Sequence, residues 1–127
     1  MRKKIRLQQG QTLVLLLIFM VVAIMITTAS VAMIVTNIKA TDKISQGTTA
    51  MDVAESGAEN AVIKLLRDPA YTGETLPVGG GQAVITISGT NPKTILVKGT
   101  LNNFTRTIQV IVDTTNNIST VTSWKEL

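Results

Sequence analysis

The chain begins with a short basic segment, and a long apolar run follows it. Residues 13–35 are apolar or small, and no charged residue separates Arg6 from Lys39. A run of about 23 residues at ~1.5 Å each makes a helix of roughly 35 Å, enough to cross a hydrocarbon core of about 30 Å. The pattern therefore predicts a membrane-spanning helix. Basic residues favour the cytoplasmic side of a membrane, so we expect the chain after Val35 to lie on the outer side.

A second helical pattern continues beyond Lys39. Small and apolar residues recur at spacings of three and four, as on the buried face of an amphipathic helix. They are Ala40, Ile44, Gly47, Met51, Ala54, Ala58, Ala61, Val62 and Leu65. No proline occurs before Pro69. We therefore predict one continuous helix from near Gln11 to near Arg67, about 85 Å long, which Pro69 ends.

Two glycines lie inside this predicted helix. Each of them, Gly47 and Gly57, weakens a helix by about 1 kcal/mol relative to alanine. We expect them where another element comes close, although a simple weak point is an equal alternative for Gly47.

The pattern changes to alternation after Pro69. Residues 70–81 are rich in glycine and proline and predict a loop. Four alternating runs follow, with asparagines at their junctions, at Asn91-Pro92, Asn102-Asn103 and Asn116-Asn117. Asparagine tolerates the left-handed backbone of tight hairpins, so the pattern predicts a four-stranded antiparallel meander.

One face of this meander is apolar. The expected inward residues are Ala83, Ile85 and Ile87 in the first run, Ile95, Val97 and Leu101 in the second, and Phe104, Ile108, Val110 and Val112 in the third. In the fourth run we expect Ile118 and Trp124 on one face and Val121 opposite, with Trp124 anchoring the strand. An apolar sheet face needs a cover, and the second helical stripe can supply it. The predicted fold class is α+β.

The net charge of +4 comes from the start of the chain. Four of the twelve basic residues precede Gly10, and the other eight balance eight acidic residues. The body is therefore neutral and carries no electrostatic footprint for nucleic acid.

Candidate chemistry is sparse. The chain has no cysteine and no histidine, which excludes thiol chemistry and removes the commonest metal ligand and general base. Glu55 and Glu59 are four residues apart on a helix and could hold a cation, but a solvated face near Lys64 is favoured. We expect no cofactor, no metal and no enzyme activity.

Several segments resemble type IV pilins and pseudopilins, closest to minor pilins of the PilX type and the tip minor pseudopilin of type II secretion. They are the basic segment Arg2-Lys3-Lys4-Ile5-Arg6, Gly10 directly before the apolar helix, and Ala54-Glu55-Ser56-Gly57 in the second helical stripe. The resemblance is specific in the first half of the chain and general in the sheet. It divides the chain into a leader (1–10), a membrane and filament-core half of the helix (11–38), an amphipathic half (39–68) and a β-meander head (69–127).

The resemblance implies a biogenesis route. A prepilin peptidase would cut between Gly10 and Gln11 and methylate the new amine. The implied partners are the cytoplasmic membrane, that peptidase, other pilin or pseudopilin subunits and the filament assembly platform. The resemblance also implies an assembly role for Glu55 and Gly57.

Two positions depart from the major members of the family. Those proteins begin the mature chain with Phe and carry Glu at its fifth position, where this chain has Gln11 and Leu15. In the family that Glu neutralises the terminal ammonium of a neighbour. Its replacement by Leu15 predicts a minor, tip or priming role.

Two other classes of protein fit parts of the pattern. Residues 13–26 could be the apolar region of a secretory signal cut after Ala32, which would release a soluble binding module. The chain could also be a single-pass anchored protein that never assembles. The apolar run continues past Ala32 and the helical period persists, which favours the pilin-like interpretation.

Overall fold

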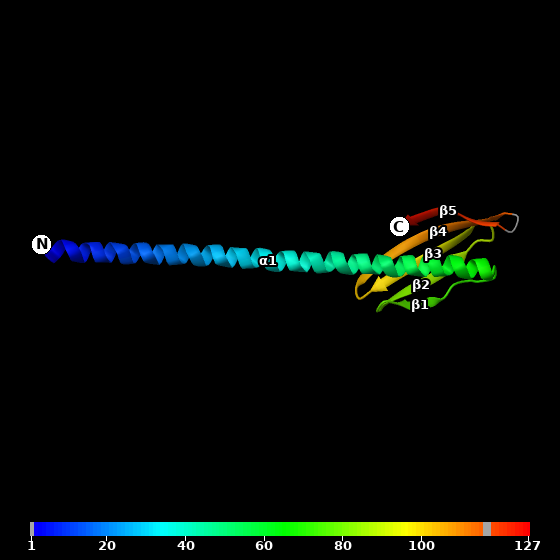
Figure 1. Ribbon diagram of the computed structural model, residues 1–127, viewed down its shortest axis with the longest axis horizontal. Helices are drawn as coiled ribbons and strands as arrows, with labels where there is room; N and C mark the ends of the chain where they lie inside the picture. The colour runs from blue at the N-terminus through cyan, green and yellow to red at the C-terminus, as the bar shows by residue number, and fades with distance from the viewer. Residues whose placement is uncertain (1, 116–117) are drawn as a thin grey trace. The chain divides into compact units, whose positions relative to one another are not determined.

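The computed structural model describes residues 2–115 and 118–127 (Figure 1). Over these residues it has one helix, α1 (Arg2–Arg67), and one five-stranded antiparallel sheet. The chain forms two compact units, Met1–Thr41 and Asp42–Leu127. The second unit, called the head below, contains the sheet and the helix segment that packs on it. The predicted α+β fold, with one long helix and a sheet, is confirmed.

Helix α1 begins earlier than the sequence predicts and ends where expected. It starts at Arg2 rather than near Gln11 and runs without interruption to Arg67. In its last turn the Lys64 carbonyl accepts a hydrogen bond from the Asp68 amide at 2.8 Å. Lys64 and Arg67 lie in the last turn, where cations interact favourably with the helix dipole. Pro69 then prevents continuation.

The sheet has one strand more than predicted. Its strands are β1 (Thr75–Val78), β2 (Gly81–Ser88), β3 (Lys93–Leu101), β4 (Phe104–Thr115) and β5 (Ile118–Glu126), in that spatial order. Strand β1 falls within residues 70–81, which we expected to be a loop. It forms because its backbone pairs with β2, from Thr75 opposite Val84 to Val78 opposite Gly81.

The hairpin between β3 and β4 uses asparagine as expected. Asn102 has a φ of +52°, in the left-handed region that Asn accepts more readily than most residues. The predicted turn at 116–117 lies outside the described residues.

A β-bulge corrects our assignment of the faces of β5. Val121 pairs with Val112 and Trp124 pairs with Val110, and the register shifts between these pairs. Directly paired residues share a face, so Val121 and Trp124 both lie on the helix side of the sheet. Ile118 pairs with Thr115, on the other face. The expected grouping of Ile118 with Trp124 was wrong, because the extra residue of the bulge reverses the alternation.

The core of the head lies between α1 and the middle three strands. Most of its members are alanine on the helix and β-branched on the sheet. From α1 come Val53, Ala54, Ala58, Ala61 and Leu65, and from the sheet come Ala83, Ile85, Ile95, Val97, Ile108, Val110 and Val112. The expected cover of the sheet by the second helical stripe is therefore present.

The two edges of the sheet are covered unequally. On the β1 side, Tyr71, Leu76 and Val78 pack against the core. On the β5 side, Val121 and Trp124 each stay 43 % exposed. A helix about 10 Å wide cannot cover five strands spaced about 4.8 Å apart. Trp124 therefore lies at the margin of the core and does not anchor the strand within it.

Candidate functional site

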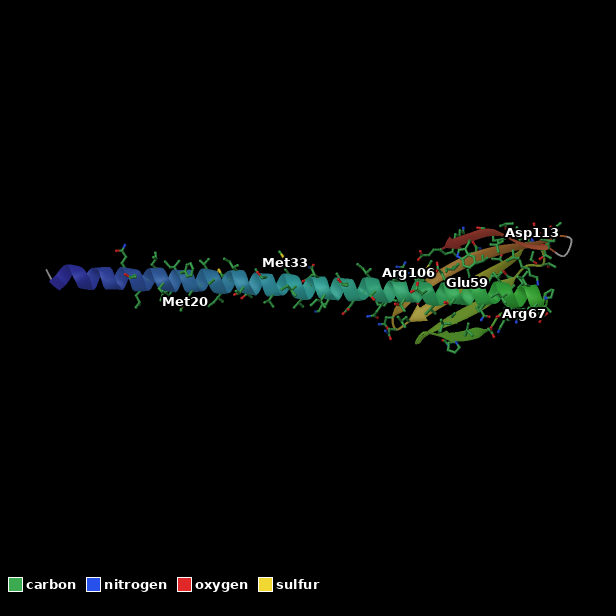
Figure 2. All side chains as sticks on the ribbon, in the orientation of Figure 1. Met20, Met33, Glu59, Arg67, Arg106 and Asp113 are labelled. Carbon is green, nitrogen blue, oxygen red and sulfur yellow. The ribbon has the colours of Figure 1, made fainter. Side chains whose placement is uncertain are left out.

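The first half of α1 presents an uninterrupted apolar surface. Every large apolar side chain between Leu13 and Ile38 is exposed, and Figure 2 shows such side chains projecting from the helix, with Met20 and Met33 labelled. This helix is long and apolar enough to cross a membrane. In lipid, such a surface needs no protein partner, whereas in water it would be costly.

The hydroxyl groups in this half of the helix are satisfied by the helix itself. Thr27 donates to the carbonyls of Ala23 and Ile24, and Thr28 donates to the carbonyl of Ile24. Ser30 and Thr36 likewise donate to carbonyls four residues earlier, at 2.9 Å each. Polar groups that bond within their own helix reduce the cost of entering an apolar environment.

The predicted processing residues lie within the helix. Gly10 and Gln11 are both helical and exposed. Apart from the adjoining residues and backbone of its own helix, no described atom lies within 4 Å of a Cβ added at Gly10. Leu15 is 70 % exposed. It lines a shallow apolar depression with Leu16, Phe19 and their neighbours on the same helix. A depression bordered by one helix is the surface relief that a second helix can pack into.

The two predicted assembly residues of the head lie on opposite sides of α1. A Cβ added at Gly57 would lie 2.7 Å from the Ala83 Cβ and 2.8 Å from Val97 Cγ1, so Gly57 permits close contact between α1 and the sheet. Glu55 is exposed on the outer side of α1. Gly57 thus contributes inside the head, whereas Glu55 is available at its surface.

An ion-paired cluster joins the loop before β1 to α1. The Lys64 ammonium pairs with the Glu74 carboxylate, which also accepts a hydrogen bond from the Tyr71 hydroxyl at 3.1 Å. Lys64 Nζ lies 5.7 Å from the centroid of the Tyr71 ring, within the range of a cation–π contact. The sequence offered no motif for this cluster, because its members come from a helix and a loop.

The cluster shifts two pKa values. Burial, the hydrogen bond to Glu74 and the negative charge of Glu74 raise the pKa of Tyr71 to about 12. The hydrogen bond from Lys64 lowers the pKa of Glu74, although partial desolvation opposes it. The arrangement fixes a loop and exposes no reactive group.

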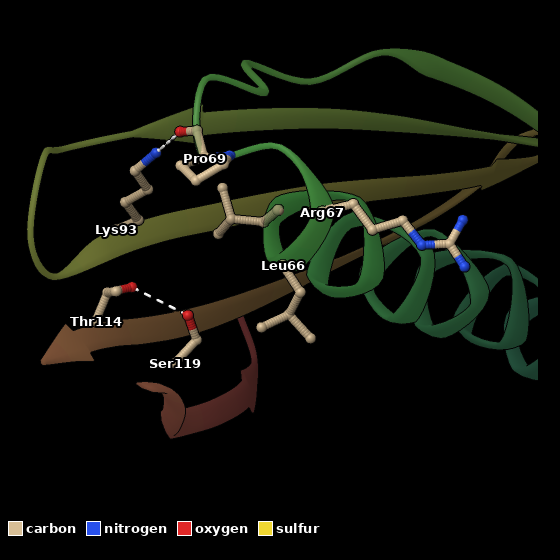
Figure 3. A pocket seen from close by; sticks show the side chains of 7 residues that line it. Leu66, Arg67, Pro69, Lys93, Thr114 and Ser119 are labelled. Carbon is tan, nitrogen blue, oxygen red and sulfur yellow. Dashed lines mark hydrogen bonds between the residues drawn. The ribbon is translucent and has the colours of Figure 1, made fainter. Parts of the chain in front are cut away.

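A hollow of about 340 Å³ lies at the C-terminal end of α1 (Figure 3). It is lined by Leu65, Leu66, Arg67, Pro69, Lys93, Thr114 and Ser119. The Lys93 ammonium donates to the Pro69 carbonyl, and the Thr114 and Ser119 hydroxyls lie 3.2 Å apart. This hydroxyl pair has neither an imidazole nor a carboxylate among the lining residues to activate it.

The described residues contain no cluster of three or more acidic, histidine or cysteine side chains placed to hold a metal. Glu55 and Glu59 are exposed, and neither carboxylate has a hydrogen bond or ion pair in the part of the chain that the structure describes. The candidate sites that remain are surfaces: the apolar half of α1 and the two faces of the head.

Comparisons with family models, with curated proteins and with solved structures found no match to this chain.

Proposed function

We propose that this chain is a minor type IV pilin-like or pseudopilin subunit, inserted in the cytoplasmic membrane and assembled at or near the tip of a pilus or secretion pseudopilus. One observation carries the proposal. A single unbroken helix has an exposed apolar half, and its other half forms the core of an α+β head. The same helix thus serves as a membrane anchor before assembly and as a packing element after it.

The basic start of the chain supports the orientation and the processing step. Arg2, Lys3, Lys4 and Arg6 precede Gly10, and positive residues hold the start of the chain on the cytoplasmic side. Cleavage between Gly10 and Gln11 by a prepilin peptidase then removes all four charges. It leaves a neutral subunit that starts directly before the apolar helix.

The apolar residue at position 15 supports the minor or tip role. A carboxylate in apolar surroundings is stable only when a cation pairs with it. Leu15 cannot pair with the terminal ammonium of a neighbour, so this subunit does not dock in the manner of a bulk filament subunit. A position at the end of the filament, or in the complex that starts it, needs no such pair.

The mature N-terminus, read by mass spectrometry on protein from the native membrane, tests the proposal. We expect a chain that begins with N-methylated Gln11, and an unprocessed chain when the peptidase gene is deleted. A chain that begins at Met33 would show a secreted module, and an intact Met1 would show a plain anchor. Either result contradicts the pilin-like function.

The minor role has its own test. We expect few copies of the chain per purified filament, and fewer or shorter filaments when its gene is deleted. Normal filaments after deletion, together with high stoichiometry in the wild-type filament, would contradict that role.

A further inference from the structure

Three carboxylates form a stripe on the outer side of α1 in the head. We call Asp52, Glu55 and Glu59 the acidic ridge; all three are exposed, and Glu59 is labelled in Figure 2. Like charges three and four residues apart weaken a helix. No carboxylate of the ridge has an ion pair or hydrogen bond within residues 2–115 and 118–127. The ridge is therefore unfavourable in the isolated chain.

The opposite face of the head carries unpaired cations. Lys98 pairs in register with Thr107, Leu96 with Gln109, and Gln109 with Lys125. These residues alternate with the core residues Val97, Ile108 and Val110, so both lysines lie on the sheet face away from α1. Val84 and Leu96, each 39 % exposed, lie beside them.

We call Val84, Leu96, Lys98 and Lys125 the lysine face. Within the described residues neither of its lysines forms an ion pair, since the ion pairs found there are Lys64–Glu74 and Arg106–Glu126. The nearest acidic residue on this face, Asp113, is two residues beyond Ile111 toward the end of β4 and accepts a hydrogen bond from Thr115.

The ridge and the lysine face lie at the same level of the head. A Cβ added at Gly99 would lie 2.5 Å from both the Ala50 carbonyl oxygen and the Ala54 nitrogen, and Val97 contacts the Gly57 position. Lys98, between Val97 and Gly99, is therefore directly behind the turns of α1 that carry the ridge. Opposite charges thus occupy opposite faces of one head.

The charges on the two faces have similar separations. Asp52 and Glu59 are seven residues apart on a helix, which is about 10 Å along its axis. Lys98 and Lys125 are separated by two strand spacings of about 4.8 Å and by two residues of about 3.4 Å, which is about 12 Å in total. A copy displaced perpendicular to the sheet, without rotation, brings its ridge over Lys98 of its neighbour, because α1 follows β2 and β3. Lys125 then lies to one side of the ridge, on β5.

We propose that the acidic ridge of one copy docks on the lysine face of a second copy of this chain, stacked in the same orientation. The proposal rests on the proposed function in one respect, because assembly in a membrane sets copies side by side in one orientation. A contact between two different faces is heterologous and can repeat to form a short open stack. Residues 11–38 carry no charged side chain, so the charged side chains that could align neighbours lie in the heads.

Cross-linking of full-length chains in their native membrane tests the docking. The chain contains no cysteine, so an introduced cysteine is the one thiol in each chain that can react. Ser56→Cys places a thiol beside the ridge, and Thr107→Cys places one beside Lys98. Two chains that each carry one of these changes should be joined by a short bifunctional thiol reagent. Two Ser56→Cys chains, or two Thr107→Cys chains, should not be joined, because neither face meets itself.

Charge reversal makes the test specific. With the same two cysteines in place, the double change Glu55→Lys and Glu59→Lys in the Ser56→Cys chain should lower the cross-linked fraction by about tenfold. The ridge then carries positive charges, which repel the lysine face of the other chain. Lys98→Glu with Lys125→Glu should do the same, and the combination of all four changes should restore the cross-link. Asp42→Lys, which changes an exposed acid outside the ridge, should leave it unchanged. Circular dichroism of each purified full-length variant checks that the head stays folded.

The outcomes separate this inference from the proposed function. If the chain begins at Gln11 but the thiol pair never reacts, or reacts equally with reversed charges, the docking is wrong and the pilin-like function stands. If the Ser56→Cys chain joins only a different protein, a second copy is not the occupant and the docking proposal is overturned. If the cross-link forms and follows charge while the chain begins elsewhere, the docking is supported and the pilin-like function is wrong.

Discussion

Helix α1 comes close to the sheet because glycine and alanine occupy the positions where their surfaces meet. Gly57 faces Ala83 and Val97, and Gly99 lies against the backbone of α1 at Ala50 and Ala54. The sequence predicted a close approach for Gly57, since a glycine inside a helix has a cost that packing can offset. It gave no comparable signal for Gly99, because a strand glycine can equally mark a bulge or a bend.

Alanine substitutions at the two helix glycines of the head should have opposite effects. Gly57→Ala places a Cβ within 2.8 Å of two side chains. We expect this overpacking to exceed the gain in helix propensity and to lower the free energy of unfolding by about 1 kcal/mol. The matched control is Gly47→Ala, whose Cβ would meet the flexible end of Arg106 at 3.4 Å. It should raise that free energy by about 1 kcal/mol. Denaturant unfolding of the full-length chain measures both, and equal effects would contradict this account of the packing.

Tyr71 should titrate well above an ordinary tyrosine. It is the one tyrosine of the chain, so the ultraviolet absorbance of phenolate reports it alone. We expect a midpoint near pH 12 in the folded protein, since burial and Glu74 raise its pKa to about 12, and one near pH 10 after unfolding. A folded-state midpoint near pH 10 would show that the cluster does not hold Tyr71.

The same shift determines how stability depends on pH. A raised pKa means that the folded state holds the proton more tightly, so Tyr71 stabilises the head fully below its unfolded value near pH 10. This contribution is lost as the pH rises toward about 12. Glu74 acts in the other direction, because its lowered pKa gives a contribution that is lost as the pH falls through the folded value. Thermal melting should show the alkaline loss in the wild-type chain, and Tyr71→Phe should remove it.

At the scale of elements, periodicity predicted the helix and four of the strands. The helical stripe and the alternating runs each last long enough to define a period. Strand β1 was missed because its alternation lasts only four residues and includes Pro77. The strand forms through its pairing with β2. The bulge in β5 was missed for a similar reason, because no single residue type marks it.

Two valines that face each other across β4 and β5 should contribute unequally to the free energy of unfolding. Val112 and Val121 are partners across the two strands, but Val112 is 2 % exposed and Val121 is 43 % exposed. Val112→Ala removes buried methyl groups and should lower the free energy of unfolding by about 2 kcal/mol, whereas Val121→Ala should cost about 0.5 kcal/mol. Denaturant unfolding compares them directly. A larger loss for Val121→Ala would mean that β5 is covered.

At the scale of the whole molecule, charge is concentrated at the start of the chain and in the head. The sequence showed that the four basic residues before Gly10 account for the net charge and that the remainder is neutral. It could not show that the neutral part has an acidic side and a basic side. That separation depends on the pairing of β3, β4 and β5 and on the level at which α1 packs, both of which are tertiary.

A carboxylate at position 15 should change how many copies a filament accepts. Leu15→Glu supplies the acid that bulk subunits of the family carry, which can pair with the terminal ammonium of a neighbour. We expect several-fold more copies per purified filament, measured by quantitative mass spectrometry. Leu17→Glu is the matched control, since it adds the same charge two residues away. It should reduce incorporation, because an unpaired carboxylate is costly in lipid. Equal effects of the two changes would contradict a role for position 15.

The hydroxyls of the apolar half have a mechanical consequence. Each of Thr27, Thr28, Ser30 and Thr36 gives its one proton to a carbonyl of its own helix. These protons are therefore not available to donate to a helix packed alongside. The rotation and height of such a helix then depend on how apolar side chains fit, as in the depression lined by Leu15 and Phe19. In the proposed assembly, the fit of these apolar side chains and the contacts between heads would together set the spacing of neighbouring helices.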